Sequence, residues 1–442
     1  MPPASPAVAF FYGAQPPWDV LKAFDLVVVD PDHVPVPQNV ALPQTRLAAY
    51  VSVGEVQPGR PYAAKMPKEW LIGENAAWGS RIIDQAAPGW PEFFVEQVIA
   101  PLWAAGYRDF FLDTLDSYHK AATTPEARAR QEAGLIAVIE ATKARFPQAR
   151  LIFNRGFEIL PKLHPLVAAV AAESLFEGYD AVAQQYRPVP PADRDWLLDK
   201  LARIRDDYRL PVIAIDYVPA AERDKAQQTA RKIAELGFIP WVANAELDTV
   251  GIGVVEAMPR RILAVHEPLA DEYALRYHSV IRHAEMPLNH LGYALETVSA
   301  DCLPTEPLSG QVAGIVVWLT QPLTTSSRQA LAAWLEKQLT AGMPIAVLGE
   351  IDFLEGTPLA SRLGLVWRDA AASAEPVTIS MVSKLVGFER QPKPHPRDFR
   401  ALDIDGGEPH LVLSQGTRRQ VAVAVMPWGG FAVDPYVIAT LP

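Results

Sequence analysis

The sequence predicts an α/β protein: a (β/α)8 TIM-type barrel, followed by a smaller open α/β domain with a β-rich C-terminal segment. This prediction rests on three observations. Eight short apolar segments recur over roughly the first 265 residues, and amphipathic helical patterns separate several of them. Buried strands that alternate with helices form parallel βα units, and eight units make a closed barrel of about 250 residues. The apolar pattern then restarts near residue 268.

The predicted barrel strands are apolar segments rich in β-branched and aromatic residues. They span residues 7–13, 26–32, 46–56, 110–116, 150–156, 166–174, 211–219 and 238–244. Amphipathic patterns predict helices at 91–106, 125–146, 193–208 and 222–237. The first two begin with proline and an acidic residue, and the first and last end at Gly106 and Gly237, as helices commonly do.

The chain after the barrel shows a second, shorter alternation of patterns. Strands are predicted at 273–280, 293–299, 313–319 and 343–349, and a helix at 326–342. From about residue 363 the segments 375–383, 409–416 and 419–433 are β-like and separated by loops. We therefore expect three parts, a barrel at 1–267, a small open α/β domain at 268–362, and a β-rich segment at 363–442 packed with that domain.

Polar side chains gather at the carboxyl ends of the barrel strands, where the active sites of such barrels lie. In strand order they are Tyr12, Asp30, Asp32, Glu55, Asp113, Asp116, Asn154, Arg155, Glu173, Asp216, Tyr217 and Asn244. Strand ends are generally polar, but the number of acids exceeds what solvation of loops requires. The sequence therefore predicts a functional site at this mouth of the barrel.

Asp113 and Glu173 form the best candidate pair, because a glycosidase needs two carboxyl groups, one proton donor and one nucleophile or base. Asn154, on the strand between them, is suited to bind a substrate hydroxyl or to orient an acid. Each residue also has a structural interpretation. Asp113 is suited to cap the next helix, Glu173 to lie on the surface, and Asn154 and Arg155 to be a turn amide and a solvated base.

Further residues of the same rim are candidates for binding substrate. Asp116 follows Asp113 closely enough to share a proton or a hydrogen-bond network, and sugars need flat apolar faces for stacking. The remaining candidates of the rim are Glu55, Asp216, Tyr50, Tyr118, Tyr217 and Trp241, and the long insertion 61–90 adds Trp70, Trp78 and Trp90. Exposed loop acids and core aromatic residues are the structural alternatives at these positions.

Composition excludes several classes of protein. The net charge is −11 and no basic stripe is present, so we expect no nucleic-acid partner, and a cationic or neutral substrate fits better. No apolar run reaches the roughly 18 residues of a membrane span, so we expect no membrane insertion. Cys302 is the only cysteine, which excludes an internal disulfide and a thiolate zinc cluster.

Motifs for metals and cofactors are incomplete. His278 and His283 are five residues apart, not four, and lack the glutamate of a metalloprotease helix. Gly251 and Gly253 do not complete a phosphate-binding fingerprint. We therefore expect no metal and no cofactor.

Several separated motifs of the barrel resemble the endo-α-1,4-polygalactosaminidases, including hydrolase domains of periplasmic proteins that modify the Pel polysaccharide. The motifs lie at 50–56, 110–118, 153–160, 171–176, 214–219 and 237–251, and the likeness spans 7–265. The resemblance implies an endo-acting hydrolase of a partly deacetylated galactosamine polymer, with Asp113, Asn154 and Glu173 on successive strand ends. It also implies a periplasmic location and, as partners, Pel biosynthesis and export proteins. The first residues carry no signal peptide, so the periplasm would require a leader not included here.

The segment 268–362 resembles the class I glutamine-amidotransferase fold. In that fold a nucleophilic cysteine follows a strand in a tight elbow, but this sequence has Glu350 at that place and Cys302 in a different loop. We expect a structural role for this domain, and the Asp/His motifs of a deacetylase are not found in the sequence.

Three functions remain open. The first is a retaining endo-glycosidase of α-1,4-linked galactosamine and N-acetylgalactosamine polymers that uses a carboxylate pair. The second is a non-cleaving module that binds and guides the polysaccharide during its modification and export. The third is a barrel hydrolase of a different amino-sugar polymer.

Overall fold

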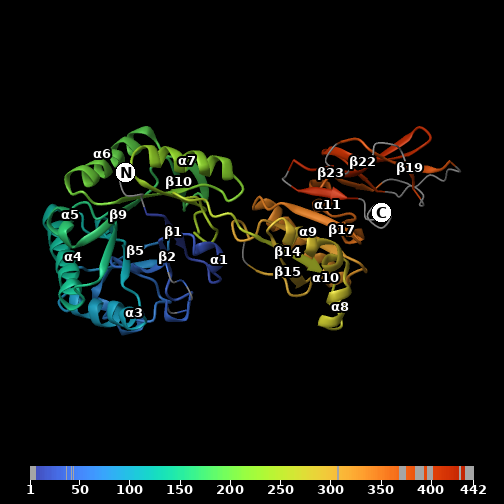
Figure 1. Ribbon diagram of the computed structural model, residues 1–442. Coiled ribbons are helices and arrows are strands. Elements are labelled where there is room, and N and C mark those ends of the chain that lie inside the picture. The colour runs from blue at the N-terminus through green and yellow to red at the C-terminus, as the bar shows by residue number, and fades with distance from the viewer. Residues whose placement is uncertain are drawn as a thin grey trace. The chain divides into compact units, whose positions relative to one another are not determined.

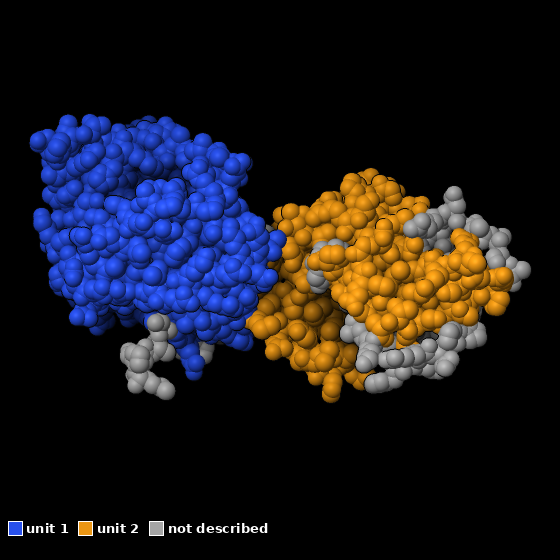
Figure 2. Space-filling model, turned by 90° about the horizontal axis from the view of Figure 1, so that it is seen from above, with its two compact units in different colours: residues 1–257 blue, residues 258–442 orange. Residues whose placement is uncertain are grey.

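A computed structural model of the chain describes residues 6–35, 37–40, 42, 44–305, 308–367, 375–383, 393–395, 402–427 and 430–433. The chain divides into two compact units, residues 1–257 and 258–442, which Figure 2 colours separately. Each unit is described by itself below. Within the described ranges, no helix is both long and apolar enough to cross a membrane.

Eight parallel strands form the first unit (Figure 1), and the predicted barrel is confirmed. In sheet order they are β1 (Val8–Phe11), β2 (Leu26–Val29), β3 (Arg46–Ser52), β7 (Asp109–Asp113), β8 (Arg150–Asn154), β9 (Val167–Glu173), β12 (Val212–Tyr217) and β13 (Ile239–Ala243). Each lies inside, or within one residue of, a predicted strand. Neighbours in this order pair in parallel.

Helices cover the outside of these strands (Figure 1). They are α1 (Trp18–Leu21), α2 (Trp90–Phe93), the π-helical η4 (Phe94–Ile99), α3 (Ala100–Ala104), α4 (Pro125–Arg145), α5 (Leu160–Leu163), α6 (Pro191–Asp207) and α7 (Arg223–Glu235). The longest, α4, starts with Pro125 in its first turn, and the Thr124 hydroxyl accepts a hydrogen bond of 3.2 Å from the Ala127 N–H. A capping hydroxyl and an early proline are the signals that start helices.

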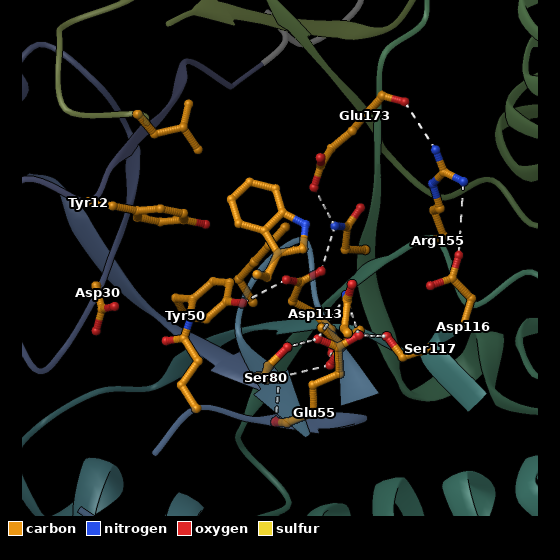
Figure 3. Close-up of a pocket in the computed structure, with 18 of the residues that line it drawn as sticks. Tyr12, Asp30, Tyr50, Glu55, Ser80, Asp113, Asp116, Ser117, Arg155 and Glu173 are labelled. Atoms are coloured by element: carbon orange, nitrogen blue, oxygen red, sulfur yellow. Dashed lines mark hydrogen bonds and ion pairs between the residues drawn. The ribbon is translucent and has the colours of Figure 1, made fainter. Parts of the chain in front are cut away.

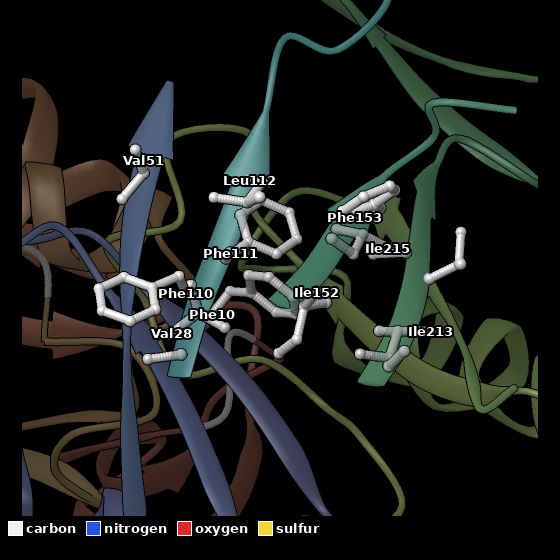
Figure 4. Close-up of a cluster of buried hydrophobic side chains, with 14 of the residues drawn as sticks. Phe10, Val28, Val51, Phe110, Phe111, Leu112, Ile152, Phe153, Ile213 and Ile215 are labelled. Carbon is white, nitrogen blue, oxygen red and sulfur yellow. The ribbon is translucent and has the colours of Figure 1, made fainter. Parts of the chain in front are cut away.

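Side chains of the barrel strands alternate between the interior and the helix layer, as the pleat of a strand requires. On β7, Phe111 meets Phe10 edge-on with ring centroids 5.1 Å apart, whereas Phe110 stacks on Trp103 of α3. Figure 4 shows part of this buried cluster. Because Asp113 lies two residues after Phe111, its side chain faces the interior of the barrel.

The end strands β1 and β13 are bridged by the segment around Gly251 and Gly253. Ile252 exchanges two backbone hydrogen bonds of 2.8 Å with Val242 of β13. A Cβ atom on Gly253 would lie 3.1 Å from the Pro240 carbonyl oxygen and 3.2 Å from the Val8 carbonyl oxygen. These glycines therefore let the chain pass closely over both end strands of the barrel.

Two small sheets lie on the loops at the barrel mouth. The insertion after β3 folds into a three-stranded antiparallel sheet of β4 (Glu55–Val56), β6 (Ser80–Ile83) and β5 (Leu71–Asn75). The loop after β7 contains the short turn η5 (Ser117–Lys120). After β9, a hairpin joins β10 (Glu177–Asp180) to β11 (Gln185–Pro188). The short turns η1 (Pro37–Asn39), η2 (Ala63–Lys65), η3 (Lys68–Trp70) and η6 (His164–Leu166) complete the unit.

The second unit is built on one nine-stranded sheet. Its order is β15 (Ala294–Ser299), β14 (Arg261–His266), β16 (Gly314–Leu319), β17 (Ile345–Gly349), β24 (Phe431–Val433), β23 (Arg418–Val425), β22 (Glu408–Gln415), β19 (Val377–Met381) and β20 (Lys393–His395). Strands β15 to β24 in this order are parallel, and the rest are antiparallel. Strands β18 (Leu365–Trp367) and β21 (Leu402–Ile404) form a separate antiparallel pair.

Helices of this unit are α8 (Glu272–Tyr277), η7 (Ile281–Glu285), α9 (Met286–His290), α10 (Thr325–Thr340), η8 (Asp352–Leu354) and α11 (Pro358–Arg362). The predicted helix 326–342 matches α10. The predicted strand at 273–280 is wrong, because α8 occupies most of it. The Asp271 carboxylate accepts a 2.8 Å hydrogen bond from the Ala274 N–H and caps this helix.

The domain boundaries differ from the predicted ones. The division falls between residues 257 and 258 rather than between 267 and 268, because β14 pairs with β15 and β16 in the sheet of the second unit. The segments 268–362 and 363–442 are not separated in the structure, since their described strands share that sheet.

Candidate active site

Three neighbouring strands end in the polar residues Asp113 on β7, Asn154 on β8 and Glu173 on β9. The Asn154 amide donates a hydrogen bond of 2.7 Å to Asp113 Oδ1 and another of 2.7 Å to Glu173 Oε1 (Figure 3). The two carboxylate oxygens are therefore no farther apart than twice that length. The sequence predicted all three residues at this mouth, and the structure brings them into one network.

Each of these three residues is followed by one in the left-handed backbone conformation. The φ angles are +63° at Thr114, +58° at Arg155 and +63° at Ser174. This conformation costs on the order of 1 kcal/mol or more for a residue with a side chain. The chain thus turns out of the strand immediately after each polar residue and leaves its side chain at the end of the barrel interior.

Two tyrosines complete the hydrogen bonding of the carboxylates. The Tyr50 hydroxyl donates to Asp113 Oδ2 at 2.7 Å, and the Tyr217 hydroxyl donates to Glu173 Oε2 at 2.9 Å. Tyr12 meets the Tyr50 ring edge-on, with centroids 5.2 Å apart. Every oxygen of the pair therefore accepts a hydrogen bond from a side chain of the barrel mouth.

Burial and nearby negative charge raise the pKa of both carboxyl groups. Burial raises the pKa of Asp113, although hydrogen bonds from Tyr50, Asn154 and the Thr114 backbone oppose this effect. Burial raises the pKa of Glu173 as well, and the nearby Asp113 charge raises it further. Two close carboxyl groups cannot both ionise without repulsion, so they titrate as a coupled pair.

The pair lies in a cleft with a volume of about 790 Å³, within the range of small-molecule sites. The predicted strand-end and rim residues that line it are Tyr12, Asp30, Tyr50, Glu55, Asp113, Asp116, Asn154, Arg155, Glu173 and Tyr217. The Arg155 guanidinium donates to the Glu173 carbonyl oxygen at 3.4 Å and lies 3.9 Å from the Asp116 carboxylate. Arg155 thereby connects two neighbouring loops of the cleft.

Glu55 is part of the wall of this cleft and is only 4% exposed. Its carboxylate accepts hydrogen bonds from the Asn75 amide at 2.9 Å and 3.2 Å, from the Ser117 hydroxyl at 2.6 Å, and from the Ser80 hydroxyl. These partners come from β5, η5 and β6. Glu55 therefore fastens the inserted sheet to the loop after Asp113.

Three predicted binding residues do not line the cleft, and that prediction is wrong for them. Asp216 is fully buried and accepts hydrogen bonds from three backbone N–H groups. Tyr118 is 2% exposed, and its hydroxyl donates to Glu132 of α4 at 3.2 Å. Trp241 is fully buried, with its ring centroid 5.5 Å from that of Phe24. Asp216 and Tyr118 point away from the interior, whereas Trp241 pairs with Ile215, which lines the cleft, and so lies on the inward face of β13 without reaching the cleft.

The three tryptophans of the insertion differ in their exposure and in whether they reach the cleft. Trp78 is 60% exposed and lines the cleft, so it can offer a flat face to a sugar. Trp90 is fully buried, and its ring centroid lies 6.0 Å from that of the partly buried Trp70. Trp78 is thus the member of this group that reaches the cleft.

Among the lining residues that sequence reasoning missed are Arg60 and Glu246. Arg60 forms hydrogen bonds of 2.7 Å and 2.9 Å to Asp30 and one of 2.8 Å to Asp32. Glu246 follows β13 and is exposed, in a loop whose other residues are buried or partly buried. Both residues stand beyond the strand ends, where no pattern of the sequence marks them.

Among the described residues, no group of three or more histidine, cysteine, aspartate or glutamate side chains is arranged to hold a metal ion. The cleft combines paired carboxyl groups with amides, hydroxyls, an exposed indole and basic side chains, among them those of Arg60 and Arg155.

Comparisons with known proteins found a family model and solved structures that match part of the chain. The model of glycoside hydrolase family GH114 matches residues 3–258. The glycoside hydrolase domain of PelA from Pseudomonas aeruginosa is 36% identical, covering 56% of this chain and 98% of that one with a TM-score of 0.52. Ega3 from Aspergillus fumigatus, solved in complex with galactosamine, is 14% identical over 56% of this chain and 93% of its own, with a TM-score of 0.43. No curated protein matched the chain.

Proposed function

The chain belongs to glycoside hydrolase family GH114, and from this premise we propose that it cleaves α-1,4-galactosaminidic bonds inside a Pel-like polymer of galactosamine and N-acetylgalactosamine. One observation carries the proposal. The Asn154 amide bridges Asp113 and Glu173 at the mouth of the barrel, in a cleft of about 790 Å³. The likeness to the PelA hydrolase domain supports the choice of polymer.

We propose a retaining mechanism. Because one amide nitrogen lies 2.7 Å from an oxygen of each carboxylate, their separation is at most twice that length. Retaining glycosidases place the two groups roughly 5–5.5 Å apart, and inverting enzymes roughly 6.5–9.5 Å apart to admit a water. The short bridge supports the first arrangement.

The electrostatics support one assignment of roles. Tyr50, Asn154 and the Thr114 backbone stabilise the charged form of Asp113. Asn154, Tyr217 and the Arg155 charge do the same for Glu173, but the Asp113 charge opposes them and raises the pKa of Glu173. Asp113 is then the ionised nucleophile that attacks the anomeric carbon, and Glu173 the acid that protonates the departing glycosidic oxygen. In the second step Glu173 takes a proton from water, which attacks the anomeric carbon and releases Asp113.

The surroundings of the pair supply binding groups. Trp78 and Tyr50 offer flat faces, and the acids of the cleft favour the cationic amines of partly deacetylated galactosamine. A periplasmic location and contacts with other Pel biosynthesis and export proteins belong to the same proposal. For the second unit we propose a structural role, since Glu350 follows Gly349 where an amidotransferase would have its cysteine.

Cleavage of purified Pel by the wild-type chain and by Asp113→Asn and Glu173→Gln variants tests this function. The wild type should release soluble oligosaccharides, and each variant should lower kcat by about 10³-fold. Asp193→Asn, an exposed acid at the start of α6, is the matched control and should retain full activity. If either site variant folds and keeps near-wild-type cleavage, the site assignment is wrong.

The same assay separates the alternatives. A polymer that binds to the wild-type protein but stays uncut would indicate a binding and guiding module. Cleavage of a different amino-sugar polymer, with Pel left intact, would indicate a barrel hydrolase of another substrate.

A further inference from the structure

The carboxylates that line the cleft differ in their partners. Asp30 is paired with Arg60, and Asp116 lies 3.9 Å from Arg155. Glu55 is held by three neighbouring side chains and lies 3.9 Å from Lys120. Glu246 is exposed, and no lysine, arginine or histidine of the described residues forms an ion pair with it. Outside the Asp113–Glu173 pair, Glu246 is thus a lining carboxylate with its charge uncompensated.

Glu246 is held in place by the loop that carries it. The Asn244 amide donates to Glu246 Oε2 at 3.0 Å and to Asp248 Oδ1 at 2.6 Å. Asn244 Oδ1 in turn accepts from the Thr249 hydroxyl at 2.6 Å. One amide therefore holds two carboxylates here, as Asn154 does for Asp113 and Glu173.

The backbone of this loop is fixed to the rest of the mouth. The Leu247 carbonyl oxygen accepts a 2.7 Å hydrogen bond from the Tyr12 N–H, and the Tyr186 hydroxyl accepts one of 3.1 Å from the Ala245 N–H. Glu246 can therefore bind a ligand without first ordering its loop, which favours affinity.

A second, independent feature of the cleft calls for a hydrogen-bond donor. Asn154 is 7% exposed, and both carboxylates of the pair accept from its amide nitrogen, which fixes the direction of its oxygen. Asn154 Oδ1 is buried and has no hydrogen-bond partner among the described residues. Buried acceptors are rarely left without a partner, so a bound ligand is expected to supply an N–H or O–H group there.

We propose that Glu246 binds an ammonium group of the sugar chain and makes the cleft prefer galactosamine over N-acetylgalactosamine. An ammonium group offers three N–H donors and a positive charge, whereas an acetamido group offers one N–H and no charge. The inference rests on the proposed function, because it concerns the polymer that the same cleft is proposed to cut.

The test compares kcat/KM for an α-1,4-linked galactosamine oligomer and for its N-acetylated counterpart. In Glu246→Gln, whose side chain can still accept from Asn244, the value for the free amine should fall about tenfold and that for the acetylated oligomer less than twofold. Glu246→Asp, which keeps the charge, should retain part of the preference. Glu235→Gln, an equal charge change at the exposed end of α7, should change neither value.

Calorimetric titration of both oligomers into Glu173→Gln, with and without Glu246→Gln, gives a readout that does not require cleavage. A loss of the binding preference on adding Glu246→Gln supports the proposal. Each assay gives a ratio of the value for the free-amine oligomer to that for the acetylated oligomer. If this ratio in the Glu246→Gln proteins stays, in both assays, within twofold of the ratio in the proteins that keep Glu246, the proposal is overturned. If the wild type cuts neither oligomer, the proposed function fails, and the titration still decides the role of Glu246.

Discussion

Thr114 is a β-branched residue in the left-handed conformation, immediately after Asp113, and such residues are rare there. Its hydroxyl accepts a 2.8 Å hydrogen bond from the Gly54 N–H, donates one of 2.6 Å to the Asp113 carbonyl oxygen, and lies 2.9 Å from Ser52 Oγ. These contacts join the end of β7 to the end of β3. We infer that Thr114 is a positioning residue for Asp113.

Replacing Thr114 with valine keeps the shape of the side chain but removes the hydroxyl. We expect kcat to fall about tenfold with KM changed less than twofold, because a displaced nucleophile affects the reaction more than binding. The separate variant Thr114→Ser keeps the hydroxyl and should retain most of the wild-type activity. Steady-state kinetics of both variants decides the matter, and equal kcat values for the two would contradict a positioning role.

Asp216 is buried behind the loop that follows Glu173, and its carboxylate accepts backbone hydrogen bonds of 2.6 Å, 2.8 Å and 2.9 Å. Burial raises the pKa of Asp216 from 3.8 to about 6, although these hydrogen bonds oppose the rise. Between these values the folded chain binds a proton that the unfolded chain has released. The contribution of Asp216 to stability is therefore fully present below the unfolded pKa and is lost as pH rises through the folded pKa.

The pH dependence of unfolding tests this linkage. The Asp216 contribution should make the free energy of unfolding about 2 kcal/mol higher at pH 4 than at pH 7. In Asp216→Asn this part of the difference should disappear, whatever the absolute stability of the variant. Urea unfolding at the two pH values measures it, with Asp193→Asn as the exposed control. An unchanged pH dependence in Asp216→Asn would count against the buried, proton-binding carboxyl group.

The sequence predicted where the cleft would lie but not which neighbouring side chains would face it. Asp113, Asn154 and Glu173 could be found because barrel sites lie at strand ends. Asp216 and Tyr217 are adjacent on β12, yet only Tyr217 faces the interior. Both faces of a parallel barrel strand are buried, so apolar alternation does not mark the inner one. Glu246 could not be predicted, because its place depends on the fold of its loop.

At the scale of elements, the eight barrel strands could be predicted because each is a short apolar run bounded by polar residues. The second unit was harder. Strand β14 is a similar apolar run that the domain prediction assigned to the barrel. The apolar residues of 273–280 fit the alternation of a strand in part. Tyr273 and Tyr277, however, also have the spacing of a helix, and the Asp271 side chain caps that helix and favours it. Short segments of this kind are ambiguous without their tertiary contacts.

The segment that bridges β1 and β13 gives a prediction at the same scale. A Cβ atom on Gly251 would lie 2.4 Å from the Val242 carbonyl oxygen and 2.8 Å from Ala243 Cβ. Gly251→Ala should therefore push the segment away from β13 and lower the free energy of unfolding by about 2 kcal/mol. Gly59→Ala, where no atom lies within 4 Å of the added Cβ, is the matched control. Similar denaturant midpoints for both variants would argue against the close approach.

At the scale of the whole molecule, each unit has its own hydrophobic core. The larger cluster of buried residues runs from Ala7 to Ala257, and a second cluster runs from Leu263 to Met426. All residues that line the cleft lie between Tyr12 and Leu247. The first unit therefore contains, within its own sequence, both a complete core and the whole candidate site.

A chain that ends at residue 257 should consequently fold and cleave the polymer with a kcat within about twofold of the full chain. A chain that ends at 267, the boundary predicted from sequence, also carries β14. That strand pairs on both sides, with β15 and β16, and its residues Leu263, Ala264 and Val265 are buried. Without these partners an apolar strand is exposed, which promotes aggregation.

Size-exclusion chromatography of the two truncated chains, followed by the cleavage assay, compares these boundaries directly. We expect the 1–257 chain to be monodisperse and the 1–267 chain to form larger species or to be recovered in lower yield. Changing Val265 to lysine in the 1–267 chain should restore a monodisperse protein, because a charge on an exposed strand opposes pairing with other chains. If the 1–257 chain fails to fold while the 1–267 chain is stable and active, β14 belongs functionally to the barrel and the division at residue 257 is wrong.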